Sequence, residues 1–136
     1  MNKYRAITRW IWAFAMMSSG TYHFLRPDIF EPMLPGILQK NALLWVWLSG
    51  YFEILGGMCL LIPSLRWAAG WGLICLYLAV FPANLYVAIS AEPTSSVWLW
   101  LRLPLQLLFM WVAWWIVQPS QSRKFHPWDN RNHDPI

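Results

Sequence analysis

Hydrophobic residues form four long runs along the chain, and only a few polar positions interrupt each run. The runs cover about residues 7–25, 43–62, 67–89 and 97–117. A helix that crosses a membrane needs about 20 predominantly apolar residues, whereas a strand would alternate apolar and polar positions. The pattern therefore predicts an all-α protein: a four-helix transmembrane bundle over residues 1–117, followed by a polar tail over residues 118–136.

The composition agrees with a membrane protein. Hydrophobic residues make up 58% of the 136 residues and charged residues only 12%. A soluble globular protein has roughly 45–50% apolar and about 25% charged residues. A chain of this length has too little interior to remove so much apolar surface from water, so lipid is the expected solvent.

Basic residues indicate how the helices are oriented. Cytoplasmic segments of membrane proteins carry an excess of lysine and arginine. Arg26 and Lys40 lie in the first connection, on the opposite side, and Arg102 lies just inside the fourth run. Both termini are therefore predicted to be cytoplasmic, and the formal charge of +4 reflects this bias rather than nucleic-acid binding. The predicted cytoplasmic side carries Lys3, Arg5, Arg9, Arg66, Arg123, Lys124 and Arg131.

The first run also needs an interpretation, because basic residues followed by an apolar stretch are typical of a secretory signal. No A-x-A cleavage pattern follows it; the chain continues SSGTYHF. We interpret the run as a membrane helix.

The connections and the tail are polar or rich in proline. Three prolines in residues 26–42 predict a segment that covers the outer mouth of the bundle, with room for a short interfacial helix. The short turn over residues 63–66 predicts that the second and third helices are antiparallel neighbours. The histidines and aspartates of the tail lack compact ligand spacing, so we expect no metal site there. Cys59 and Cys75 lie at different depths and are interpreted as packing residues rather than a disulfide.

Glu53 stands out because it is an acid near the centre of the second run. A carboxylate that faces lipid costs roughly 2.5–3.5 kcal/mol on insertion scales. The positions three and four residues away share its helix face, and all of them are small. Small residues allow helices to approach closely in a membrane, so Glu53 is predicted to point into the bundle. The small positions are Ser49, Gly50, Gly56 and Gly57, and we assign a structural role to the three glycines.

The other three helices supply polar residues near the same depth. At 1.5 Å of rise per residue, the whole set lies about 3–15 Å from the outer interface. Pro82 and Pro104 lie beside the set; each removes a backbone donor and frees a carbonyl, at Leu78 and Trp100 respectively. The sequence thus predicts a polar cavity in the outer half of the bundle. Its candidate residues for ligand binding or proton relay are His23, Glu53, Asn84, Arg102 and Gln106.

Two interpretations of this cluster stay open. In the first, the five side chains bind a ligand or relay a proton. In the second, Glu53 and Arg102 neutralise each other while Asn84 and Gln106 join helices, and the cluster only stabilises the fold. The sequence leaves the protonation state of Glu53 undetermined.

Four stretches in order resemble a known family: HFLRPDIFEPMLPGIL, FEILGGMCLLIP, VFPANLYVAI and LRLPLQ. Together they are similar to the DoxX-like family of small four-helix bacterial membrane proteins. The resemblance implies a multi-pass protein of the bacterial inner membrane. Its motif positions fall on His23, Arg26, Pro27, Glu53, Gly56, Gly57, Pro82, Asn84, Arg102 and Gln106.

The resemblance also implies a function, an accessory subunit of a quinone-linked redox system. Arg102, Gln106 and His23 would donate to the quinone carbonyls and Glu53 would relay a proton. The chain lacks a CxxC pair, a haem-ligand pair and a nucleotide motif, so autonomous catalysis is not expected and no catalytic residue is assigned.

Two alternatives stay beside the redox hypothesis. One is the binding or transport of another small lipophilic molecule, and the other is a structural role as a protein partner in a membrane complex. In each case we expect membrane lipid as a neighbour, no covalent cofactor, no metal and no nucleic acid.

Overall fold

The computed structural model of the chain describes residues 3–90 and 96–118, and every regular element in these ranges is a helix. Nearly all of the predicted polar tail, with its basic residues, histidines and aspartates, lies outside the described residues. The four long helices are α1 (Lys3–Leu25), α4 (Ala42–Leu61), α5 (Arg66–Ser90) and α6 (Ser96–Val117).

The first helix differs most from its predicted bounds, because α1 begins four residues earlier than the apolar run. Its first turn is basic and so falls outside the hydrophobic pattern. Contacts with the end of α6 hold this turn in place. The Arg5 Nη1 atom donates a hydrogen bond to the Gln118 carbonyl oxygen at 2.8 Å, and the guanidinium lies 5.4 Å from the centre of the Trp115 ring.

The described residues form six α-helices, so the predicted number of four is wrong. The two further helices, α2 (Pro27–Phe30) and α3 (Gly36–Gln39), lie in the first connection on either side of a 3-10 turn, η1 (Glu31–Met33). Proline fixes φ near −65°, which suits the first turn of a helix but prevents continuation of a preceding one. Pro27 begins α2, Pro32 lies in η1 and Pro35 caps α3, so the connection folds as three short turns.

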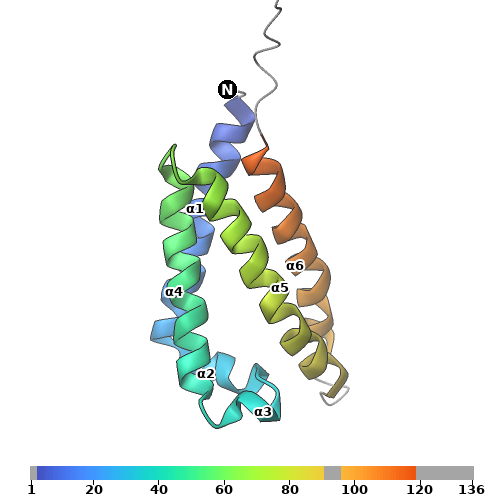
Figure 1. The fold of residues 1–136 in the computed structure, drawn as a ribbon. Coiled ribbons are helices and arrows are strands. Elements are labelled where there is room, and N and C mark those ends of the chain that lie inside the picture. Colours follow the sequence, from blue (N-terminus) through green and yellow to red (C-terminus); the bar gives the residue numbers. More distant parts are fainter. Residues whose placement is uncertain (1–2, 91–95, 119–136) are drawn as a thin grey trace, which may run out of the picture.

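The long helices run up and down. Figure 1 shows the beginning of α1, the α4–α5 turn and the end of α6 at one end, and the α2–α3 connection at the other. α1 packs along α4, α4 along α5 and α5 along α6. α4 and α5 meet at their shared turn and diverge toward the connection (Figure 1). This divergence leaves space between them at the connection end.

The apolar core fills the half of the bundle nearer the α4–α5 turn. Ala13 and Met16 of α1, Leu60 of α4, and Leu73 and Tyr77 of α5 form one buried cluster. The Tyr77 hydroxyl donates a hydrogen bond to the Met16 sulfur atom, which satisfies its only polar group inside this cluster. The core therefore anchors the helices on one side of the space between α4 and α5.

Glycines bring α1 and α4 into direct backbone contact. A Cβ added to Gly50 would lie 2.8 Å from the Gly20 carbonyl oxygen, and one added to Gly57 would lie 2.8 Å from the Ala13 carbonyl oxygen. Gly56 points elsewhere, toward the Leu73 side chain of α5. Real Cβ atoms do not approach other atoms so closely, so the α1–α4 distance depends on Gly20, Gly50 and Gly57.

Within the described ranges, three helices are long and apolar enough to cross a membrane: α4, α5 and the Leu99–Val117 part of α6. α1 does not belong to this group. It carries Lys3, Arg5 and Arg9 in its first half and small polar residues in its second. Large apolar side chains cover the outside of all four long helices.

Candidate functional site

Polar side chains from all four long helices line one small chamber, here called the inner chamber. Its volume is about 130 Å³. Ser19, Ser49 and the Tyr77 side chain add to its wall. The inner chamber brings together all five residues that the sequence singled out: His23 from α1, Glu53 from α4, Asn84 from α5, and Arg102 and Gln106 from α6.

The Glu53 carboxyl lies closest to His23. The His23 Nδ1 atom is 3.7 Å from the Glu53 Oε2 atom, and both residues are buried at 8% exposure. His23 Nδ1 also lies 2.9 Å from the Ser19 carbonyl oxygen. A carbonyl oxygen can only accept, so Nδ1 carries a hydrogen and donates it there. The Ser19 side chain hydrogen-bonds the carboxyl, but the buried Oε2 atom has no hydrogen-bond partner.

The His23 ring is held from its other side by the connection. Phe30 of α2 stacks on it, with 3.8 Å between ring centres and 16° between ring planes. The stacked phenyl ring shields the imidazole from the connection side. The connection therefore forms part of the site rather than only a cover.

The direct ion pair of Glu53 with Arg102, considered from the sequence, is not formed. Among the described residues, the ionisable basic side chain within 4.0 Å of Glu53 is the His23 imidazole. The Arg102 Nη1 atom instead donates to the Met33 sulfur atom of η1. The packing explains this, because the glycines hold α4 against α1, whereas α6 packs mainly on α5.

Asn84 and Gln106 connect α5 to α6. The Asn84 Nδ2 atom donates to the Gln106 Oε1 atom at 3.0 Å, and the Gln106 Nε2 atom donates to the Tyr77 carbonyl oxygen at 2.6 Å. The sequence predicted that Pro82 would free the Leu78 carbonyl; the amide from α6 binds the neighbouring Tyr77 carbonyl instead. Helix α5 continues through Pro82, and α6 through Pro104.

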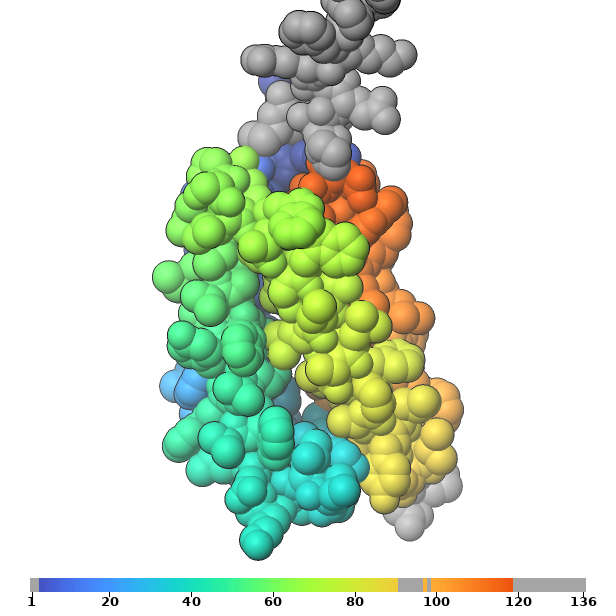
Figure 2. Space-filling view, in the orientation of Figure 1, coloured from blue at the N-terminus to red at the C-terminus, as the bar shows by residue number. Residues whose placement is uncertain are grey.

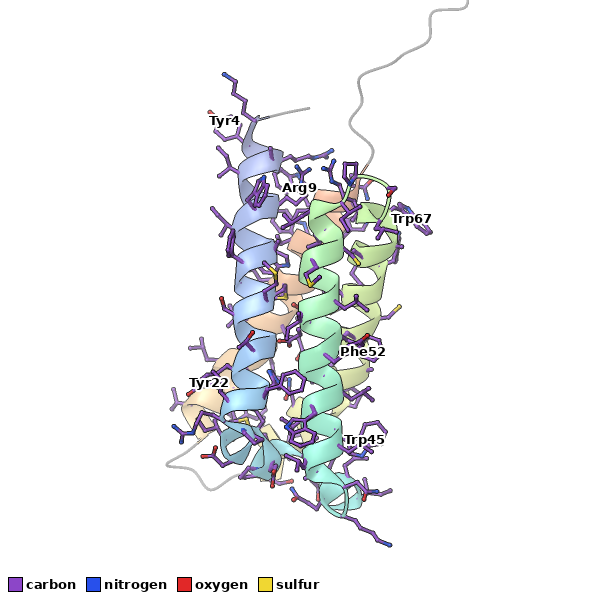
Figure 3. All side chains as sticks on the ribbon, turned by 90° about the vertical axis from the view of Figure 1, so that its left-hand side faces the viewer. Tyr4, Arg9, Tyr22, Trp45, Phe52 and Trp67 are labelled. Atoms are coloured by element: carbon purple, nitrogen blue, oxygen red, sulfur yellow. The ribbon has the colours of Figure 1, made fainter. Side chains whose placement is uncertain are left out.

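A larger apolar space, here called the outer chamber, adjoins the inner chamber between α4 and α5. Its volume is about 340 Å³. Trp45 and Phe52 of α4 face Ala79 and Ala83 of α5 across it. Figure 2 shows the molecular surface hollowed between α4 and α5, above the connection. Figure 3 shows Trp45 near the connection and Phe52 at about the middle of α4. The two chambers share seven wall residues: His23, Phe30, Ser49, Leu76, Val80, Asn84 and Arg102.

The sequence interpretation missed the residues that the connection contributes. Phe30, Met33, Leu34 and Leu38 line the outer chamber. These residues follow one another at intervals of three, one and four, which is the spacing of one apolar helix face. The spacing is visible in the sequence, but prolines break the segment, so the pattern alone does not predict an apolar surface that faces the chamber.

The structure also describes both cysteines and the remaining potential metal ligands of residues 3–90 and 96–118. These residues contain no group of three or more histidine, cysteine, aspartate or glutamate side chains that could hold a metal ion. Cys59 and Cys75 are free thiols. His126, His133, Asp129 and Asp134, which were considered as ligands, lie outside the described residues.

A family model for a domain of unknown function, DUF8561, matches residues 12–117. No curated protein and no solved structure matches the chain significantly. The match covers both chambers, the second half of α1 and all of α4, α5 and α6. It corrects the resemblance drawn from the four sequence stretches, since the matching family is not DoxX.

Proposed function

We propose that this chain, which belongs to the DUF8561 family of unknown function, binds a small lipophilic molecule inside a membrane. The apolar part of the ligand occupies the outer chamber, and its polar head enters the inner chamber and reaches Glu53. The ligand comes from the lipid through the space between α4 and α5.

The observation that carries this proposal is that the two chambers adjoin and share part of their walls. Ligand sites are concave, mostly apolar and contain a few polar groups that fix orientation, with volumes from about 300 Å³ upward. The outer chamber has this size and character. It shares part of its wall with a polar chamber that contains a buried carboxyl oxygen without a hydrogen-bond partner. A purely structural cluster has no need for the apolar space beside it.

The same proposal places the chain in the membrane. α1 is the fourth span, which makes a four-helix transmembrane bundle with membrane lipid around it. Lys3, Arg5, Arg9 and Arg66 lie at the end that holds the beginning of α1 and the α4–α5 turn (Figure 1). The positive-inside rule assigns this end, and both termini, to the cytoplasmic side of the inner membrane. The two chambers then lie in the outer half of the bilayer.

The redox role rested on the DoxX resemblance and is withdrawn with it. Lipophilic binding needs only the residues and volumes of the chambers. We therefore prefer the first alternative from the sequence, binding or transport of a small lipophilic molecule, over a quinone-linked subunit.

Filling the outer chamber tests the proposal. Ala83 lines the outer chamber on α5, and an Ala83→Phe variant would occupy it. Ala68 is an exposed residue of the same helix outside that chamber, so Ala68→Phe is the matched control. Each protein is purified in mild detergent, and the molecules that remain bound are identified by mass spectrometry.

We expect a defined lipophilic species with the wild type and with Ala68→Phe, reduced at least about tenfold in Ala83→Phe. Thermal unfolding of the three proteins shows whether they are folded. Identical bound species in all three would contradict the proposal, and so would a stoichiometric protein partner without any bound small molecule.

A further inference from the structure

We infer that the ligand is a zwitterionic amphiphile, with an anionic group next to its apolar tail and a protonated amine at its far end. This inference rests on the proposed function and names the class of its ligand. It follows from the order in which the apolar wall, Arg102 and Glu53 are met on the way inward.

The tail end of the ligand is fixed by the outer chamber. Its wall includes Trp45, Leu48 and Phe52 on α4 and alanine and valine side chains on α5. An ionic group placed here would lose its hydration without gaining a partner. The charged part of the ligand must therefore lie deeper.

Arg102 marks the junction, because it lines both chambers. A guanidinium has five N–H donors, and a thioether is a weak acceptor. The contact with Met33 therefore leaves most of the donor capacity of Arg102 unused. No carboxylate lies within 4.0 Å of this guanidinium in the described part of the chain. A phosphate or carboxylate at the junction would supply the missing acceptors and charge.

Glu53 marks the deep end, because it lines only the inner chamber. The buried Oε2 atom has no hydrogen-bond partner, and the nearby His23 Nδ1 hydrogen is donated to Ser19. The Asn84 side-chain amide donates to Gln106, and the Gln106 amide donates to the Tyr77 carbonyl. In its ionised form, which a neighbouring positive charge favours, the Glu53 carboxylate only accepts hydrogen bonds. The partner of Oε2 is then a donor, and an ammonium group provides both the hydrogen and the opposite charge.

The order of tail, anion and amine is the order of groups in phosphoethanolamine lipids. A lipid head group that carries only negative charge would lie against the Glu53 carboxylate with no positive group to offset the repulsion. A phosphocholine head carries the positive charge but has no N–H to donate. The inner chamber, at about 130 Å³, admits a small head and not a second tail.

Head-group competition on the full-length protein in detergent tests the inference. Native mass spectrometry measures the binding of lysophosphatidylethanolamine, lysophosphatidylglycerol and lysophosphatidylcholine with the same acyl chain. We expect the wild type to bind the ethanolamine lipid about tenfold or more tightly than either other lipid, as one charge-assisted hydrogen bond allows.

Glu53→Gln removes the carboxylate charge but keeps the shape, and should bring the ethanolamine and glycerol lipids within about twofold of each other. Arg102→Gln should weaken both at least about fivefold, because both carry the phosphate. Glu31→Gln and Lys40→Gln remove charges outside both chambers and should leave the preference unchanged. Should Glu53→Gln fail to fold, the comparison of the three lipids on the wild type remains decisive.

Equal binding of the three lipids by the wild type, or an unchanged preference in a folded Glu53→Gln variant, would overturn the inference. If all three bind equally and Ala83→Phe blocks all of them, the proposed function stands and only the head-group inference fails. If none of them binds and no other species is lost from Ala83→Phe, the proposed function fails as well.

Discussion

His23 and Glu53 lie opposite each other on two helices whose backbones touch, with 3.7 Å between Nδ1 and Oε2. The approach of α1 and α4 at Gly20 and Gly50 makes this distance possible. Glu53 and Arg102 belong to the same chamber but do not form such a pair. We therefore expect Glu53 to be coupled energetically more strongly to His23 than to Arg102.

Double-mutant cycles on the free energy of unfolding measure both couplings. Glu53→Gln combined with His23→Phe should give a coupling energy of about 0.5–3 kcal/mol, the range for residues in contact. Glu53→Gln combined with Arg102→Gln should give a smaller value. A larger coupling for the arginine pair would show that Arg102 is the true partner of Glu53.

Gly50 should tolerate no side chain. A Cβ there would lie 2.7 Å from the His23 Cβ atom, so Gly50→Ala must push α1 away from α4. We expect a loss of about 1–3 kcal/mol in the free energy of unfolding, as for other overpacked sites. Titration with a denaturing detergent measures the loss.

Gly72→Ala is the matched control, since Gly72 also lies inside a long helix but has nothing within 4 Å of an added Cβ. This change should be neutral or stabilise by up to about 1 kcal/mol. Equal losses for the two variants would mean that helix propensity, and not the close approach of α1 and α4, sets the effect at Gly50.

The Asn84–Gln106 hydrogen bond should contribute only modestly to stability. Interhelical hydrogen bonds in membrane proteins average about 0.6 kcal/mol and reach about 1.7 kcal/mol. The cycle of Asn84→Leu and Gln106→Leu should give a coupling in this range. Asn84→Leu with Tyr4→Leu, at the exposed start of α1, should be additive. A coupling energy near zero for Asn84 and Gln106 would show that their side chains do not form this hydrogen bond.

Asp28 should titrate below the ordinary range of an aspartate. Arg26 donates two hydrogen bonds to its carboxylate, at 3.1 and 2.9 Å, and these bonds and the guanidinium charge lower the pKa of Asp28. A carboxyl group whose pKa is lower in the folded than in the unfolded protein stabilises the folded state at pH values above its unfolded pKa. This contribution is lost as the pH falls through the pKa of the folded state. The pair is exposed, so its effect on stability at neutral pH should be small.

Carboxyl NMR of the wild type and Arg26→Gln checks this. The pKa of Asp28 should rise toward its usual value in the variant and stay low in Lys40→Gln. An unchanged pKa in Arg26→Gln would show that the pair does not persist in solution.

Much of the fold follows from the sequence, because long apolar runs allow little besides helices. The bounds of α4, α5 and α6 lie within one residue of the predicted runs. The start of α1 was missed because basic residues held by tertiary contacts carry no hydrophobic signal. The short helices were missed because proline starts and stops them within four residues.

The candidate site was predictable as a set but not as a network. Depth and helix face place Glu53, His23, Asn84, Arg102 and Gln106 in one region, and the structure brings them into one chamber. Which of these side chains touch depends on which helices are neighbours. The depth of a residue in the bundle does not give that information. The ligand-binding or proton-relay role of these residues stays a prediction.

The central claim is that a lipophilic tail lies between α4 and α5, and photocrosslinking tests it most directly. The full-length protein in vesicles is exposed to a lysophosphatidylethanolamine with a photoreactive acyl chain, and the adducts are located by peptide mass spectrometry. We expect adducts concentrated on residues 45–52 and 79–83 and suppressed by an excess of unlabelled lipid. Adducts spread over all exposed apolar residues, including Trp67 and Trp71, and insensitive to competition would contradict the claim.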